Sequence, residues 1–135
     1  MKNAFLISLL FTACFTFSQN LSGPTWMLSS IDNLETAKST QITTSIKAFL
    51  IFESDSAYSG RFCNTYSGRV RTNASRQMKL TVPSATKLSC LGIDSYEKEL
   101  FELLPKVTKY RIEEGYLYLF TINRKRITFK ASDKK

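Results

Sequence analysis

Apolar and polar residues alternate along several short stretches of the chain, and a period of two is typical of β-strands with one buried face. Met78, Leu80 and Val82 alternate with polar residues in this way and predict a half-buried strand. Residues 48–52 form a continuous apolar run, which suits a strand that is covered on both faces. Turn residues separate further predicted strands over residues 25–30, 58–63, 66–72, 108–113, 116–122 and 126–131.

Residues 31–45 interrupt this pattern, because they are polar and rich in Ser and Thr. Asp32 and Asn33, which favour turns, stand near the start of the segment. We expect a long surface loop here. Just before it, the single tryptophan, Trp26, is expected to fill the core near one end of the domain.

One segment has the periodicity of a helix, predicted over residues 95–104. Its apolar stripe consists of Tyr96, Leu100, Leu103 and Leu104. Asp94 is the expected N-cap, Glu97 completes an acidic variant of the capping box, and Pro105 ends the helix. The charged residues are interpreted as a solvent-exposed face, made of Glu97, Lys98, Glu99 and Glu102.

Together these elements predict a mainly β fold. We expect a small antiparallel rolled sheet or barrel of about seven to eight strands, with one short helix packed on it and covering an open end. A chain of this size supports one hydrophobic core, so residues 19–135 are expected to form a single domain.

The N-terminal residues 1–18 have the layout of a signal peptide, with Lys2 followed by a short apolar run and then by small and polar residues. The apolar run is shorter than the roughly 20 residues that a membrane span needs, so the protein is not expected to cross a membrane. Cys14 offers an alternative, because Phe11, Thr12 and Ala13 before it loosely resemble a bacterial lipoprotein site. We expect export to a bacterial periplasm or outer-membrane surface, with a lipid anchor at Cys14 as the alternative.

Cys63 and Cys90 remain after removal of the leader, and an even pair in an exported chain predicts one disulfide. The alternative is two separately buried thiols. The formal net charge of +8 indicates a basic surface, which either aids solubility or attracts anionic polymers. We expect no nucleic-acid partner, because an exported protein rarely meets one.

The sequence predicts no catalytic, cofactor-binding or metal-binding residues. It contains no histidine, which excludes triads and His-containing metal sites, and it has no glycine-rich phosphate loop. Paired-carboxylate hydrolysis would have to draw on turn residues that are ordinarily solvated, namely Glu53, Asp55, Glu113 and Glu114. The chain is therefore expected not to be an enzyme.

The predicted strand 116–122 is apolar on both faces, with Tyr116, Tyr118 and Phe120 on one side. These aromatic side chains either are buried under the helix or form a surface for a ligand or a protein partner. A basic set gathers near the C-terminus: Arg124, Lys125, Arg126, Lys130, Lys134 and Lys135. A solvated tail explains this set, and contact with anionic lipid or glycan is the alternative.

Two segments contain a cysteine motif: residues 59–68 read SGRFCNTYSG and residues 85–90 read ATKLSC. They resemble the two cysteine-containing motifs of META domains, the HslJ-like family of bacterial envelope proteins. The motif residues are expected to be structural, and they are Gly60, Cys63, Asn64, Tyr66, Gly68, Thr86 and Cys90. The segment from Gly23 to Leu28 is similar to the opening strand of the family.

The resemblance implies a compact antiparallel β fold with a helix, placed in the bacterial cell envelope, and it implies no catalytic residues. The family is associated with heat response and antibiotic tolerance. We therefore expect a monomeric, non-enzymatic, stress-related envelope protein that acts by binding or stabilising contacts. Two alternatives stay open: a carrier of a small apolar ligand in a lipocalin-like barrel or on the aromatic face, and a secreted inhibitor or adhesin.

Overall fold

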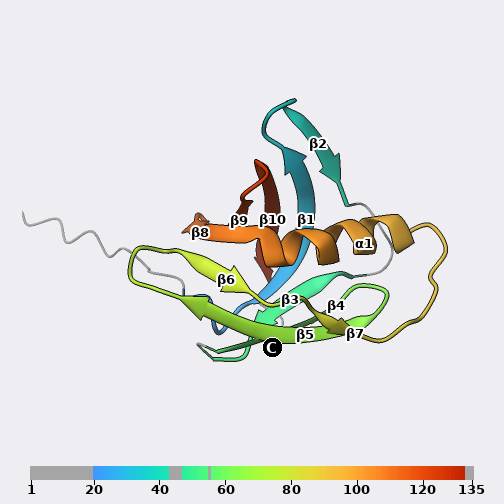
Figure 1. Cartoon of the computed structure of the whole chain (residues 1–135), viewed down its shortest axis with the longest axis horizontal. Helices are drawn as coiled ribbons and strands as arrows, with labels where there is room; N and C mark the ends of the chain where they lie inside the picture. The colour runs from blue at the N-terminus through green and yellow to red at the C-terminus, as the bar shows by residue number, and fades with distance from the viewer. Residues whose placement is uncertain (1–19, 43–46, 55, 133–135) are drawn as a thin grey trace, which may run out of the picture.

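The computed structural model describes residues 20–42, 47–54 and 56–132. The predicted signal peptide and Cys14 lie outside the described residues, as do Asp55, Lys134 and Lys135. The described chain is mainly β, with a short helix, and this confirms the predicted fold class (Figure 1).

The strands are short, as the alternating pattern predicts. They are β1 (Thr25–Asn33), β2 (Lys38–Gln41), β3 (Phe49–Phe52), β4 (Ala57–Arg61), β5 (Thr65–Thr72), β6 (Met78–Leu80), β7 (Ser84–Ala85), β8 (Val107–Glu113), β9 (Tyr116–Thr121) and β10 (Lys125–Ser132). The α-helix α1 (Asp94–Leu103) continues into the 3₁₀ turn η1 (Leu104–Lys106).

The strands form one antiparallel sheet in the order β6-β5-β4-β3-β1-β10-β9-β8, with β2 added beside β1 and β7 beside β5. The sheet rolls until its two ends meet, where Gln77 bridges to Lys109 and the Tyr110 N–H donates to the Arg76 carbonyl at 3.0 Å. The result is a nearly closed barrel, which leaves few free strand edges.

Residues 31–41 of the segment predicted as a long loop belong to a β-hairpin instead. β1 extends to Asn33 and β2 pairs with it, from Asn33 opposite Lys38 to Ser30 opposite Gln41. The Asn33 side chain begins the turn by accepting the backbone N–H groups of Glu35 and Thr36, as expected of a turn former. Main-chain pairing with β1 and the hydrogen bond from Ser39 to Asp32 hold β2, whose side chains are mostly exposed, so no apolar periodicity marks it.

A β-bulge at Ser29 changes the direction of the side chains of β1. Leu28 is opposite Phe129 on β10, but Ser30 is already opposite Thr128, so Ser29 is an extra residue. Trp26, Leu28 and Ile31 therefore enter the core, whereas Ser30 and Asp32 turn to the outer face. Trp26 is fully buried as predicted, and its indole N–H donates to the Leu21 carbonyl at 3.0 Å.

Large side chains fill the interior of the barrel. The fully buried ones include Trp26, Tyr58, Phe62, Tyr66, Leu100, Leu117, Leu119, Ile127 and Phe129. Burial of this apolar surface drives folding, at roughly 1.5–3 kcal/mol for each large side chain. Val82, expected in the same pattern as Met78 and Leu80, is 73% exposed, because β6 ends at Leu80.

The helix lies across one face of the rolled sheet and buries Leu100 and Leu103 (Figure 1). Two expectations about its first turn are wrong. The N-cap is Ile93 rather than Asp94, and no side chain caps the helix. Glu97 is not solvated, because its side chain enters the core and the residue is only 6% exposed.

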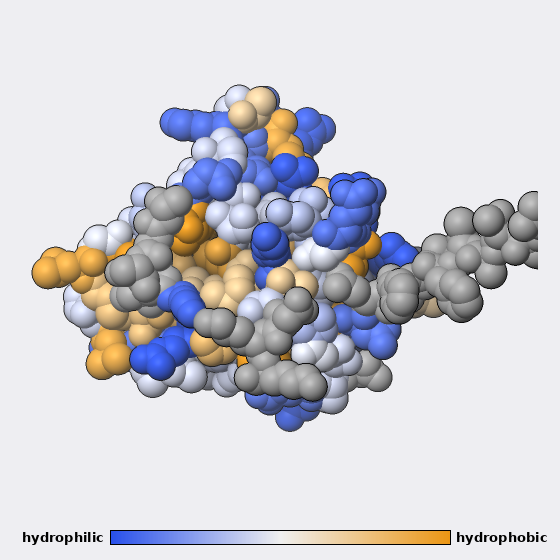
Figure 2. Space-filling view, turned by 180° about the vertical axis from the view of Figure 1, so that it is seen from behind, coloured by the Kyte–Doolittle hydropathy of each residue, from blue (hydrophilic) through white to orange (hydrophobic). Residues whose placement is uncertain are grey.

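The hydropathy of the surface differs between the ends of the molecule. Figure 2 shows mainly hydrophilic atoms over the β1–β2 hairpin at the top and hydrophobic atoms at the left, where the β7–α1 loop lies. Leu88 and Leu91 of that loop are 65% and 100% exposed. The hairpin thus presents mainly polar groups, apart from the exposed Leu34 in its turn, whereas the exposed Leu88 and Leu91 lie at another end of the molecule.

Candidate functional site

The aromatic residues of β9 face outward. Tyr116, Tyr118 and Phe120 are partly exposed, whereas Leu117 and Leu119, on the opposite face of the strand, are fully buried. The Tyr116 and Tyr118 rings stack with centroids 6.2 Å apart and an interplanar angle of 25°. Of the two interpretations of this face, burial under the helix is wrong, since none of the three side chains belongs to the core.

Basic side chains from both neighbouring strands lie over these rings. Arg111 on β8 and Arg126 on β10 place their guanidinium carbons 5.2 and 5.4 Å from the centroid of the Tyr118 ring. Lys109 lies 5.6 Å from the centroid of Phe120. The rings attract these cations through the negative charge of their faces. We call this surface, made of Tyr116, Tyr118, Phe120, Lys109, Arg111 and Arg126, the aromatic-basic face.

The aromatic-basic face borders a cleft of about 470 Å³ between β9, β10 and the β1–β2 hairpin. Tyr116, Tyr118 and Arg126 form one side. The hairpin contributes mainly hydroxyl, amide and charged side chains, and the lining there includes Ser30, Asp32, Asn33, Lys38, Ser39 and Gln41. The volume is within the range of about 300–1,000 Å³ that is usual for small-molecule sites.

Asp32 organises the base of this cleft. Its carboxylate accepts hydrogen bonds from Arg126 at 3.0 Å, from Ser39 at 2.5 Å and from Thr128 at 3.4 Å. Burial raises the pKa of Asp32, but hydrogen bonds from Ser39 and Arg126, the charge of Arg126 and a hydrogen bond from Ser30 outweigh it, so the pKa lies below its usual range. Asp32 is thus a charged anchor for Arg126, and its own acceptor positions are occupied.

The electrostatic balance of the aromatic-basic face, together with the cleft beside it, is positive. Arg126 pairs with Asp32, and Arg111 pairs with Glu113 at 3.2 Å. Among the described residues, no carboxylate lies within salt-bridge distance of Lys38, Lys109 or Lys130. Lys130 is opposite Tyr116 in the β9–β10 register and is exposed. An anionic ligand would therefore meet uncompensated positive charge here.

The structure brings the predicted motif residues together at another place, the turn between β4 and β5. Gly60 pairs with Tyr66 and Gly68 pairs with Tyr58, so each glycine lies beneath a tyrosine ring of the neighbouring strand. A Cβ atom on Gly68 would lie 2.5 Å from the Tyr58 hydroxyl, and one on Gly60 would lie 2.5 Å from the Tyr66 hydroxyl. Both positions therefore require glycine, because a tyrosine ring packs directly on the backbone at each of them.

The two tyrosines are buried and hydrogen-bonded. Tyr58 donates to the Thr81 carbonyl at 2.7 Å, and Tyr66 donates to the Phe49 carbonyl at 3.1 Å. Burial raises the pKa of Tyr58 to about 12, although the hydrogen bond to Thr81 opposes this. Burial, with the nearby Tyr58 and Glu97, also raises the pKa of Tyr66. Neither phenol is therefore suited to act as an acid or base near neutral pH.

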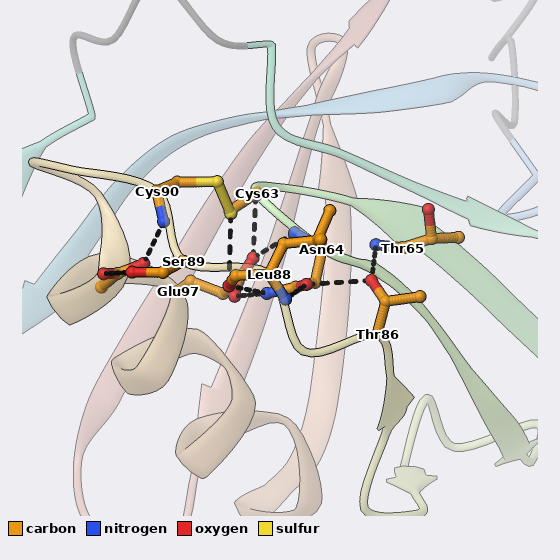
Figure 3. The surroundings of a disulfide bond; sticks show 9 residues. Cys63, Asn64, Thr65, Thr86, Leu88, Ser89, Cys90 and Glu97 are labelled. Carbon is orange, nitrogen blue, oxygen red and sulfur yellow. Dashed lines mark hydrogen bonds between the residues drawn. A yellow bond between two sulfur atoms is a disulfide. The ribbon is translucent and has the colours of Figure 1, made fainter.

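Asn64 connects this turn to the β7–α1 loop and to the helix (Figure 3). Its side-chain oxygen accepts from the Thr86 hydroxyl at 2.9 Å and from the Leu88 N–H at 2.6 Å. Its amide group donates to Glu97, which also accepts the backbone N–H groups of Cys63 and Asn64 at 2.7 Å each. These contacts explain the structural role expected of Asn64 and Thr86.

Cys63 and Cys90 form a disulfide beside this network, with their Cα atoms 6.0 Å apart (Figure 3). The Cys90 N–H donates to Asp94 at 2.9 Å, so Asp94 stabilises the end of the loop instead of capping the helix. The disulfide closes a separation of 27 residues and, with the Asn64–Glu97 contacts, fixes the loop to the β4–β5 turn. Cys63, Asn64 and Glu97 at the centre of the cluster are buried, and their contacts are structural in geometry.

Sequence reasoning missed two of the residues that matter most. Asp32 was expected in a loop and Glu97 on a solvated face, because no local pattern reports a partner on a distant strand. Arg126 was grouped with a solvated basic tail, but it is an ordered residue of β10 that is paired with Asp32. One feature of the sequence does indicate the burial of Glu97: it is a polar residue on the side of the helix that carries the apolar stripe.

Among the described residues, no group of three or more His, Cys, Asp or Glu side chains is placed to hold a metal ion. No helix among these residues is long and apolar enough to cross a membrane.

The fold and the two clusters define a small β-barrel-like domain with a buried disulfide network and a polar, basic cleft on its outer face. A family model described as META domain matches residues 19–134, and the chain therefore belongs to the META domain family. This confirms the resemblance that the two cysteine motifs indicated. No curated protein matches the sequence.

Solved structures share the fold at low sequence identity. An NMR structure of a protein from Burkholderia xenovorans has a TM-score of 0.70 at 17% identity, covering 84% of this chain and 85% of that chain. A crystal structure of a DUF4847 family protein from Bacteroides vulgatus has a TM-score of 0.65 at 16% identity, covering 85% of this chain and 96% of that chain. These likenesses show the fold alone.

Proposed function

We propose that this chain is a non-enzymatic, exported protein of the bacterial cell envelope that acts by binding a ligand or partner at the aromatic-basic face. The observation that carries the proposal is the exposure of Tyr116, Tyr118 and Phe120 beside a cleft and beneath ordered cations. Partly exposed aromatic side chains with cations packed on them supply large contact area and charge recognition in one surface.

Export is supported by the N-terminal sequence and by the disulfide. Residues 1–18 have the layout of a signal peptide, and disulfides persist mainly in oxidising compartments. The site of action in this proposal is the periplasm or the surface of the outer membrane. Family membership supports a role in stress, in heat or antibiotic tolerance.

The ligand proposed for this site is polar rather than apolar. The interior of the described barrel is filled by large side chains such as Trp26, Tyr58 and Phe129. The cleft on the outer face, in contrast, is lined mostly by hydroxyl, amide and charged groups. A polar or charged partner fits this lining better than the apolar ligand of a lipocalin-like carrier does.

The experiment compares host strains that carry the wild-type gene, a deletion, Tyr118→Ser, or Leu91→Ser. Leu91 is fully exposed in the β7–α1 loop, outside the cleft, and so it provides the matched surface control. We expect the deletion and Tyr118→Ser strains to survive heat and envelope-directed antibiotics less well than wild type, and Leu91→Ser to behave as wild type. Fractionation is expected to place the wild-type protein, starting at Gln19, in the envelope.

Two results would contradict the proposal. If the Tyr118→Ser strain survives as well as wild type but the deletion strain does not, the aromatic-basic face is not needed for the function. Recovery of the protein only from the cytoplasm, with residues 1–18 still attached, would contradict a role in the envelope.

A further inference from the structure

The aromatic strip of the cleft suits a ring with an apolar face. The Tyr116 and Tyr118 rings are nearly parallel, and both are partly exposed at the edge of the cleft. The faces of aromatic rings carry partial negative charge. The axial C–H groups of a sugar ring form an apolar, weakly positive surface, and they pack on such faces without needing a matching hydrogen-bond pattern.

The wall opposite the rings suits a ligand with many hydroxyl groups. The hairpin contributes both donors and acceptors to the cleft, from Asn33, Ser39 and Gln41. The Gln41 amide donates to the Ser39 hydroxyl at 3.0 Å, and Ser39 in turn donates to Asp32, so these groups are held in place. Ordered amides and hydroxyls of this kind match the paired donor and acceptor character of sugar hydroxyls.

The charge of the cleft favours an acidic group on that ligand. Arg111 and Arg126 flank Tyr118 from two strands, and Lys38 stands on the hairpin wall. Arg111 keeps half of its side chain exposed despite its ion pair with Glu113, so its remaining donors can reach a ligand. A carboxylate beside these groups would gain charge-assisted hydrogen bonds.

The position of the rings within the sheet disfavours an acidic peptide. β9 pairs with β8 on one side and with β10 on the other, so its backbone has no free edge beneath the aromatic-basic face. Peptides that add to a sheet need such an edge for their main-chain hydrogen bonds. Recognition at this face therefore depends on side chains alone, as is suitable for a ligand without a peptide backbone.

We propose that the aromatic-basic face and its cleft bind an acidic saccharide, whose ring packs on Tyr116 and Tyr118 and whose carboxylate is bound by Arg111 beside Tyr118. This inference rests on the proposed function, of which it names the ligand class. Asp32 acts in it as a positioning residue that holds Arg126 against Tyr118.

The test is a calorimetric titration of the purified, disulfide-bonded chain with three probes of similar length: tetragalacturonate, the neutral sugar galactotetraose, and tetraglutamate. We expect tetragalacturonate to bind, galactotetraose to bind at least about tenfold more weakly, and tetraglutamate to give no binding. Tyr118→Ala and Arg111→Gln should each weaken tetragalacturonate about tenfold, whereas Leu91→Ser should not. Both altered side chains are partly exposed, so these variants are expected to fold.

Each contrary result has a definite meaning. Equal binding of tetraglutamate and tetragalacturonate would overturn the inference in favour of acidic peptides or of unspecific charge attraction. No binding of either sugar, or unchanged binding by both cleft variants, would also overturn it. If the sugars fail but Tyr118→Ser still impairs survival in the host, the proposed function stands and only the ligand class is wrong.

Discussion

The carboxyl group of Glu97 accepts hydrogen bonds from both Cys63 and Asn64 while it lies buried at the first turn of α1. The donors come from the β4–β5 turn, 33 and 34 residues away along the chain. Without this acceptor, backbone N–H groups of the turn would stay buried and unpaired, which costs about 1–3 kcal/mol for each group. A single side chain thus connects the helix to the sheet.

We predict that Glu97→Gln destabilises the protein by about 1–3 kcal/mol, because one acceptor oxygen becomes an NH₂ group that faces other donors. Urea unfolding monitored by circular dichroism measures the change. Glu102→Gln, an exposed change on the same helix, is the control and should stay within about 0.5 kcal/mol of wild type. Equal stability of the two variants would show that the Glu97 contacts contribute nothing measurable.

At the scale of elements, the β1–β2 hairpin is attached to β10 through Asp32. Its carboxylate joins Ser39 on β2 to Arg126 on β10, and the side chain of Asp32 is only 9% exposed. The bulge at Ser29 makes this contact possible, because it turns Asp32 to the outer face of the sheet. The geometry of the cleft therefore depends on one irregular residue and one ion pair.

This attachment predicts a dependence of stability on acid pH. Because the pKa of Asp32 is lower in the folded state than the ordinary value of 3.8, its ionised form stabilises the fold above that pH. The contribution is lost as pH falls below 3.8 and through the lowered pKa of the folded state. Chemical denaturation of the wild type between pH 2 and 6 should show that its free energy of unfolding falls as the pH drops below 3.8.

The matched variants are Asp32→Asn and Glu35→Gln, which lie in the same hairpin. Asp32→Asn should be less stable than wild type near neutral pH and should approach it as the medium becomes acidic. Glu35→Gln, at an exposed position, should follow the wild-type profile. Parallel profiles for wild type and Asp32→Asn would contradict the stabilising role of the carboxylate.

At the scale of the whole molecule, the disulfide and the closure of the barrel act on different parts of the sheet. The barrel closes between β6 and β8, where Gln77 bridges to Lys109. The disulfide instead fixes the β7–α1 loop, which carries the exposed Leu88 and Leu91, to the β4–β5 turn. The loop is therefore held at both of its ends, by the disulfide and by the hydrogen bonds of Asn64.

We predict that the double variant Cys63→Ala, Cys90→Ala folds but is about 3–4 kcal/mol less stable, since the bond closes a span of 27 residues in the unfolded chain. The filled core and the Asn64–Glu97 contacts keep the native structure. Denaturation with and without reductant measures the effect: reductant should destabilise wild type and leave the double variant unchanged. If reductant leaves the stability of the wild-type protein unchanged, the disulfide does not have this stabilising role.

The sequence by itself determined the class of fold, the strands with strong alternation and the family. Side chains such as Leu117, Leu119, Ile127 and Phe129 are buried as a period of two predicts, since this period depends only on the local geometry of a strand. The turn at Glu114 and Gly115 also depends on local geometry alone, since both residues have the positive φ that a tight hairpin turn requires. The motif around Cys63 and Asn64 identified the family without any knowledge of the fold.

The tertiary structure decided everything that depends on a partner far along the chain. Pairing with β1 made a hairpin of a polar segment that has no pattern of its own. The bulge at Ser29 sent Asp32 to the outer face, and contacts across 33 or more residues buried Glu97. The side of β9 that faces solvent, and the cations that lie over its rings, likewise follow from strand order, because a residue's exposure depends on its neighbours in space.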